Sequence, residues 1–170
     1  MAEPDAWLRG PVPGVDPLLA PAAHAFIQAG EDAARAAAEL AAAELWAAPP
    51  GGAAPIGFHL RHMAGATERL LTYARGVALT PEQFAAAKAE ADPGSAPPAA
   101  AALLDSLDRA IAGALAELRA TPREKILEAR AVGRAALPTN VLGLLFHAAE
   151  HAQRHAGQLV TTAKLLRGLR

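Results

Sequence analysis

The chain has 170 residues, a formal net charge of −1 and no cysteine. Its length predicts one domain over residues 1–170 with a sizeable core, and its near-zero charge gives no reason to expect nucleic acid or an anionic membrane as a partner. The lack of cysteine excludes disulfides, cysteine-ligated zinc and a cysteine nucleophile. Because the sequence shows neither a secretory pattern nor about 20 consecutive apolar residues, we expect a cytoplasmic protein.

Proline and glycine divide the chain into helical segments. An irregular Pro- and Gly-rich arm over residues 1–16 comes first, and a short extra helix is expected to begin in LTPEQ, with Thr80 as its cap. Four long helices are predicted over residues 17–45 (or to an earlier end near 38), 56–75, 99–119 and 138–169. Residues 123–136 fit no helical pattern, although LEARAV suits a short extended segment.

The predicted helices are amphipathic. The third helix has an apolar stripe at helical spacing, made of Leu103, Leu104, Leu107, Ile111, Leu115 and Leu118. No convincing strand pattern and no repeat are present, so we expect an all-α four-helix bundle. The connections after the second and third long helices are long enough to cross an end of the bundle, so the helices need not alternate in direction.

The histidines are concentrated in two segments. Three of the six lie at steps of four in HAAEHAQRHAGQ, as His147, His151 and His155. Residues four apart stack on one helix face, about 6 Å apart along the axis, so a neighbouring pair can direct its nitrogens to one point. His147 and His155 lie about 12 Å apart and cannot do so easily. A lone histidine such as His24 is expected to be a partly buried, hydrogen-bonded side chain.

A third nitrogen can come from the second helix, which carries His59 and His62 in FHLRHMAG. Neutral imidazole binds zinc, nickel, iron and copper. Three protein ligands leave a coordination position open, which is typical of a reactive site rather than a structural one. Gln158 follows His155 by three residues and is placed to orient a substrate or a ligand ring.

A different motif overlaps the same stretch. HAAEH, residues 147–151, matches the H-x-x-E-H pattern of inverted zinc proteases, with Glu150 as the base. Those enzymes take a third ligand far downstream, whereas this sequence ends soon after the motif, and a helical bundle has no sheet edge to bind an extended peptide. Glu150 also points about 100° away from His151. We therefore do not favour a protease.

The sequence resembles the DinB-like, YfiT-related family of metal-binding bundle proteins. The resemblance covers nearly the whole chain and depends on GFHLRHMAGATERLLTYARG and LPTNVLGLLFHAAEHAQRHAGQL. It implies His62, His151 and His155 as ligands of a divalent metal, zinc or nickel first and iron or manganese as alternatives. It also implies that His59 supports the site or replaces a ligand, and that His147 forms a wall or transfers protons.

The same resemblance implies a homodimer and two classes of function. One is a metal-dependent enzyme, a hydrolase or a thiol S-transferase, acting on a small-molecule substrate with water or an external low-molecular-weight thiol. The other is a non-catalytic, stress-related metal-binding bundle. The family's commoner H-R-G-Q tail is H-A-G-Q here, so any role of that arginine is lost.

Overall fold

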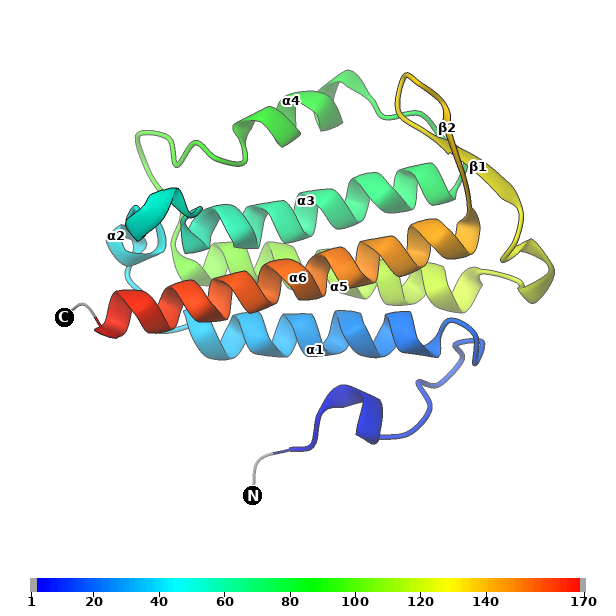
Figure 1. Ribbon diagram of the computed structural model, residues 1–170, viewed down its shortest axis with the longest axis horizontal. Coiled ribbons are helices and arrows are strands. Elements are labelled where there is room, and N and C mark those ends of the chain that lie inside the picture. Colours follow the sequence, from blue (N-terminus) through cyan, green and yellow to red (C-terminus); the bar gives the residue numbers. More distant parts are fainter. Residues whose placement is uncertain (1–2, 169–170) are drawn as a thin grey trace.

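The computed structural model describes residues 3–168 and is predominantly helical (Figure 1). Its long helices are α1 (Ala20–Ala37), α3 (Ile56–Ala74), α5 (Ala100–Ala120) and α6 (Val141–Gly168). The shorter helices are α2 (Ala42–Leu45) and α4 (Pro81–Ala89), and three 3₁₀ turns occupy Ala6–Leu8, Pro50–Gly52 and Arg123–Lys125. The predicted four-helix bundle and its short extra helix are therefore confirmed.

The four long helices form a ring. Each packs against two neighbours, in the order α1, α6, α3, α5. Figure 1 shows that α3 and α5 run in one direction while α1 and α6 run in the other. The directions do not alternate along the chain because residues 75–99 return along the outside of α3 before α5 begins. This connection contains α4, whose N-terminus is capped by Thr80 through a hydrogen bond from Gln83 N.

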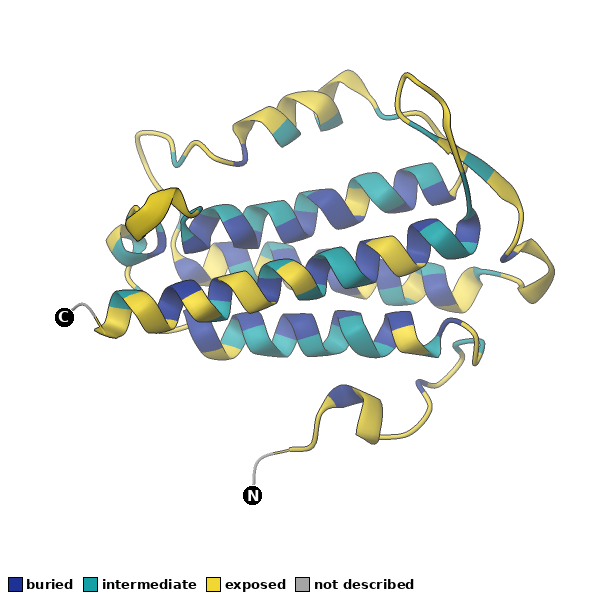
Figure 2. Ribbon diagram, viewed as in Figure 1, coloured by how far each residue is buried: buried dark blue, intermediate teal, exposed yellow. Residues whose placement is uncertain are grey.

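The core lies between the four helices, whose buried faces point inward (Figure 2). On α1 most buried residues are alanine or glycine, with Phe26 as the large exception. Small side chains let helix axes approach closely, and large ones from the facing helices fill the space. Leu60, Met63, Leu107 and Leu145 are fully buried and supply much of that volume.

One expectation about an element boundary is confirmed and another is wrong. Helix α1 ends at Ala37, as the earlier end near residue 38 predicted, and the Glu44 carboxylate accepts the N–H of Ala41 where α2 starts. The last helix begins at Val141 rather than at Pro138, because the Asn140 side chain accepts the N–H of Gly143 and caps the helix there. The predicted end at residue 169 lies outside the described residues.

The all-α bundle also has a small hairpin, although the sequence showed no convincing strand pattern. Strands β1 (Ala129–Val132) and β2 (Leu137–Asn140) pair antiparallel, with Pro138 opposite Ala131. Proline lacks an N–H donor and is tolerated in a two-stranded ribbon because each strand has a free edge. The LEARAV segment, which suited an extended conformation, therefore contains β1.

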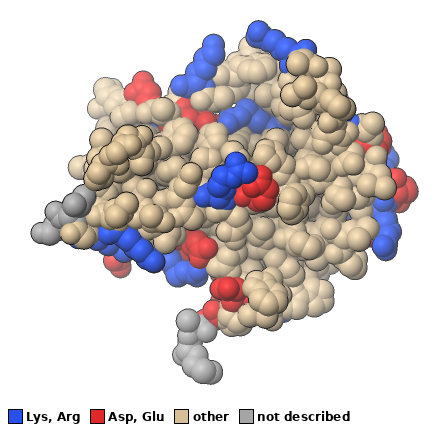
Figure 3. All heavy atoms as spheres, in the orientation of Figure 1, with Lys and Arg blue, Asp and Glu red and all other residues tan. Residues whose placement is uncertain are grey.

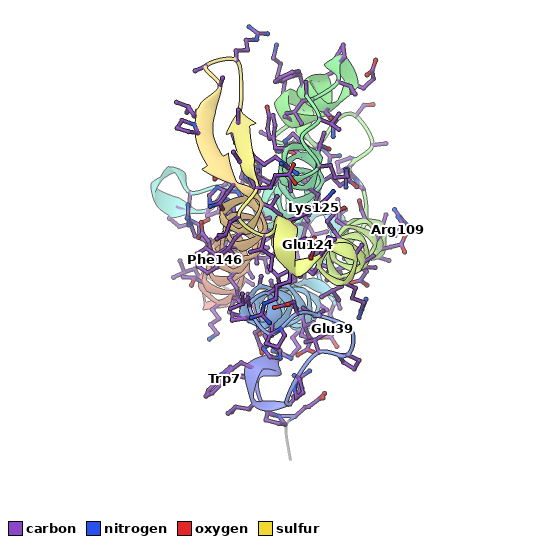
Figure 4. The ribbon with its side chains drawn as sticks, turned by 90° about the vertical axis from the view of Figure 1, so that its right-hand side faces the viewer. Trp7, Glu39, Arg109, Glu124, Lys125 and Phe146 are labelled. Atoms are coloured by element: carbon purple, nitrogen blue, oxygen red, sulfur yellow. The ribbon has the colours of Figure 1, made fainter. Side chains whose placement is uncertain are left out.

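Seen along the bundle axis, the hairpin and α4 lie on one side and the N-terminal arm lies on the opposite side (Figure 4). The described part of the arm, residues 3–16, is irregular apart from its 3₁₀ turn. It is fastened to α1, where the His24 ring bonds the Gly10 carbonyl and Arg9 pairs with Glu31. Within residues 3–168 no helix combines the length and the apolarity needed to cross a bilayer.

Candidate metal centre

Three histidines from two helices meet at one point of the bundle. His62 comes from α3, and His151 and His155 come from α6. The centroids of their rings are 5.0, 4.5 and 4.6 Å apart, which makes a nearly equilateral triangle. Each ring offers one nitrogen such that the three nitrogens lie within 4.8 Å of one another. The structure thus brings together the three residues expected to bind a metal.

The packing of α3 on α6 explains this meeting. His151 and His155 are one helical turn apart, so their rings stack along the same face of α6. Ala148, Ala152 and Ala156 are buried beside them, and these small residues let α3 come close. On α3, Leu60 and Met63 fill the core next to His62. The apolar pattern that assembles the bundle therefore also sets the position of the rings.

The rings are in direct contact through their nitrogens. His62 Nε2 lies 2.8 Å from His151 Nε2, and His59 Nδ1 lies 2.9 Å from His155 Nδ1. His59 is buried, and its ring also hydrogen-bonds the backbone of Ala54. Which nitrogen of each pair donates is set by the tautomers of the two rings.

Burial keeps His151 and His155 in the neutral form. Burial, together with repulsion from His62, lowers the pKa of His151 to about 4 and that of His155 to about 4. Burial followed by the charge of His62 also lowers the pKa of His59. At neutral pH the rings of His151 and His155 therefore carry lone pairs rather than positive charge, which is the form that binds a cation.

Two neighbours of the cluster were not anticipated from the sequence. The Phe58 ring stacks on His62 at a centroid distance of 5.1 Å and an interplanar angle of 14°. Glu90 Oε2 accepts a hydrogen bond of 2.7 Å from His62 Nδ1. Phe58 lies four residues before His62, so helical spacing alone predicts its contact. Glu90 lies in AKAEADPGS, where it resembles an exposed acidic residue before a turn, and no local pattern indicates its burial.

The other predicted site residues lie outside the triangle. His147 is exposed, donates from Nδ1 to Glu150 Oε1, and has its ring 5.5 Å from that of His151. Glu150 also pairs with Arg154. Burial raises the pKa of Glu150, but hydrogen bonds from Arg154 and His147 outweigh it and hold the pKa below its ordinary value. Gln158 is exposed, and within residues 3–168 it makes no hydrogen bond to a histidine.

The two arginines near His62 in the sequence are partly buried and bound to neighbouring groups. Arg69 pairs with Glu90 at 2.6 Å. Arg61 lies over the ring of Trp46 and donates to the carbonyls of Ala89 and Asp92. Neither was expected to fasten α4 to α3, although both do so. On the face shown in Figure 3 the charged side chains that the structure describes are scattered, without a large patch of one sign.

The donor set fits a divalent cation. Two nitrogens bound tetrahedrally to zinc lie about 3.3 Å apart, so the 2.8 Å between His62 Nε2 and His151 Nε2 needs to widen only slightly. His62 gives its Nδ1–H to Glu90, which leaves Nε2 as the nitrogen with a lone pair. His151 Nδ1 is buried without a partner among the described residues. Three imidazole nitrogens within 4.8 Å of one another form a donor set that suits one divalent cation.

Comparison with known proteins agrees with the fold and the histidine geometry. A search of curated proteins finds no significant match. The family profile described as DinB superfamily matches residues 25–159, which include α3, α6 and the three converging histidines. Because this match covers well over half of the sequence, the chain belongs to the DinB superfamily.

Proposed function

We propose that the protein is a metal-dependent enzyme in which His62, His151 and His155 hold one divalent cation. The observation that carries this proposal is the convergence of three ring nitrogens, within 4.8 Å, from two helices. Zinc and nickel suit neutral imidazole best, and iron and manganese are the alternatives. With only three protein ligands a coordination position stays open for a reactant.

A cation in such a site supplies Lewis-acid activation of water or of a thiol. The residues of this chain have separate tasks around it. His59 holds the Nδ1 of His155, so that the opposite nitrogen of this ring faces the centre of the triangle. Phe58 covers one face of His62 and keeps water from that side of the ring. The exposed pair His147 and Glu150 lies next to His151, where it can exchange protons with solvent.

The reaction that we propose is hydrolysis or thiol transfer on a small molecule. Because the chain has no cysteine, a thiol nucleophile has to come from a second, low-molecular-weight substrate. We include a homodimer in the proposal, to be checked by light scattering. The second candidate function is a metal-binding bundle without turnover. It has the same histidine geometry, and it differs only in that no reactant is converted at the open coordination position.

Metal uptake is the first test. The protein is incubated with zinc or nickel, freed of excess ion by dialysis and measured by elemental analysis. We expect about one ion per chain for wild type and a loss of binding for His62→Ala and for His155→Ala. The matched control is His24→Ala, which removes a histidine that bonds the Gly10 carbonyl far from the triangle. Equal metal content in all four proteins contradicts the proposed site.

Turnover is the second test. Metal-loaded and metal-free protein are assayed against esters and against electrophiles offered with a panel of low-molecular-weight thiols. Metal-dependent product formation that disappears in His155→Ala supports the enzyme. A fully loaded protein that is inert toward both panels favours the non-catalytic bundle.

A further inference from the structure

Glu90 is a buried carboxylate that the proposed site does not yet use. It follows directly after α4, is 7% exposed, and belongs to the connection between α3 and α5. Its Oε1 accepts a hydrogen bond of 2.6 Å from Arg69, and its Oε2 accepts one of 2.7 Å from His62 Nδ1. A buried carboxylate is costly unless it is paired, so these two partners explain how it is tolerated.

Several contacts fix Glu90 in this position. Arg61 donates to the carbonyls of Ala89 and Asp92, which hold the backbone on both sides of Glu90. Gly65 leaves room for the carboxylate, since a Cβ there would lie 2.4 Å from Glu90 Oε1. The side chain therefore reaches His62 from a backbone that is already anchored to α3.

The hydrogen bond between Glu90 and His62 is not needed to attach the end of α4 to α3. The contacts of Arg61 and Arg69 already attach it. A carboxylate on Nδ1 selects the tautomer in which Nε2 is the free nitrogen, and His62 Nε2 is the atom that faces His151. Histidines that bind metals usually donate their second N–H to such an acceptor, which orients the ring and makes it a stronger ligand.

We propose that Glu90 is a positioning residue of the metal centre, holding His62 in the tautomer and orientation that present Nε2 to the cation. The inference rests on the proposed function and deepens it, because it gives a residue of the α3–α5 connection a role in metal binding. Loss of such a partner commonly weakens metal binding by about 10- to 100-fold.

Glu90→Gln tests the role with little change of shape. The amide has two possible orientations. If its oxygen accepts from His62 Nδ1, its NH₂ group faces Arg69, which is also a donor. If its NH₂ group faces His62, it favours the tautomer with the proton on Nε2. The matched control is Glu68→Gln, which removes the same charge from an exposed position on α3. Glu68 lines the same 570 Å³ cavity between α3, α4 and α5 as Glu90.

Two measurements decide the proposal. Zinc affinity, from competition with a chromophoric chelator, should fall by about 10- to 100-fold in Glu90→Gln and stay at the wild-type value in Glu68→Gln. Nitrogen-15 NMR of the metal-free wild type should show His62 protonated at Nδ1, a preference that Glu90→Gln should weaken. An anchor without a role at the metal would leave the zinc affinity of Glu90→Gln at the wild-type value.

The outcomes separate the two proposals. Wild-type affinity in Glu90→Gln, or a His62 protonated at Nε2 in the metal-free wild type, overturns the role of Glu90 and leaves the metal centre intact. A wild-type protein that binds no zinc or nickel overturns both. Should Glu90→Gln fail to fold, the NMR measurement on wild type still decides the tautomer.

Discussion

Acid should destabilise the metal-free protein before its carboxylates titrate. His151 and His155 have pKa values lowered to about 4 in the folded chain, against 6.5 in the unfolded chain. Between these values the unfolded chain binds more protons, so the free energy of unfolding falls as the pH falls. One such histidine costs about 2.5 kcal/mol at pH 4.5. Because His151 contributes to the lowered pKa of His155, the two costs overlap, and we expect about 2 to 4 kcal/mol in all.

Urea denaturation in the presence of a chelator measures this loss between pH 7.5 and 4.5. His155→Gln should lose less stability over that range than wild type, because only the cost of His151 remains, whereas His24→Gln should lose as much. The paired carboxylates Glu90 and Glu150 have lowered pKa values, so their contribution disappears only below about pH 4.5. An unfolding free energy that stays constant from pH 7.5 to 4.5 would refute the reasoning.

Three further substitutions test the packing around the site. Gly57→Ala places a Cβ 2.5 Å from the Trp46 indole and should cost about 1–3 kcal/mol in chemical denaturation. Gly113→Ala, on the open side of α5 with no atom within 4 Å of the new Cβ, should instead stabilise by about 0.5–1 kcal/mol. Arg69→Met leaves the buried Glu90 with one partner fewer, and we expect a loss of about 2–4 kcal/mol by the same assay.

The long helices were predictable because their signals are local. Apolar residues at helical spacing and proline and glycine breaks place α3 and α5 within one residue of the observed bounds, and the Thr80 cap places the start of α4. The errors arise where one side chain decides a boundary. Asn140 starts α6 three residues later than Pro138 suggested, and the β1–β2 hairpin is too short to leave a repeated alternation of apolar and polar residues.

The histidines of the site were partly predictable, because the spacing of two of them within one helix is also a local signal. A spacing of four puts His151 and His155 together within one helix, while the choice of His62 over His59 needed the family resemblance. The structure shows why both are near: His62 faces the ring of His151, and His59 lies behind His155. Glu90 was missed because its contact depends on the path of residues 75–99, which no local pattern specifies.

The lowered pKa values of His151 and His155 link the stability of the metal-free fold to metal binding. Burial and the charge of His62, which lower the pKa of His151 and His155, weaken the metal-free fold in acid. They also mean that a cation arriving at neutral pH displaces few protons from these rings. Metal affinity should therefore decline less between pH 7.5 and 6 than it does for exposed histidines with pKa near 6.5. A decline as steep as that of an exposed histidine pair would show that the rings are protonated in solution and that the packed, neutral cluster is not the state that binds.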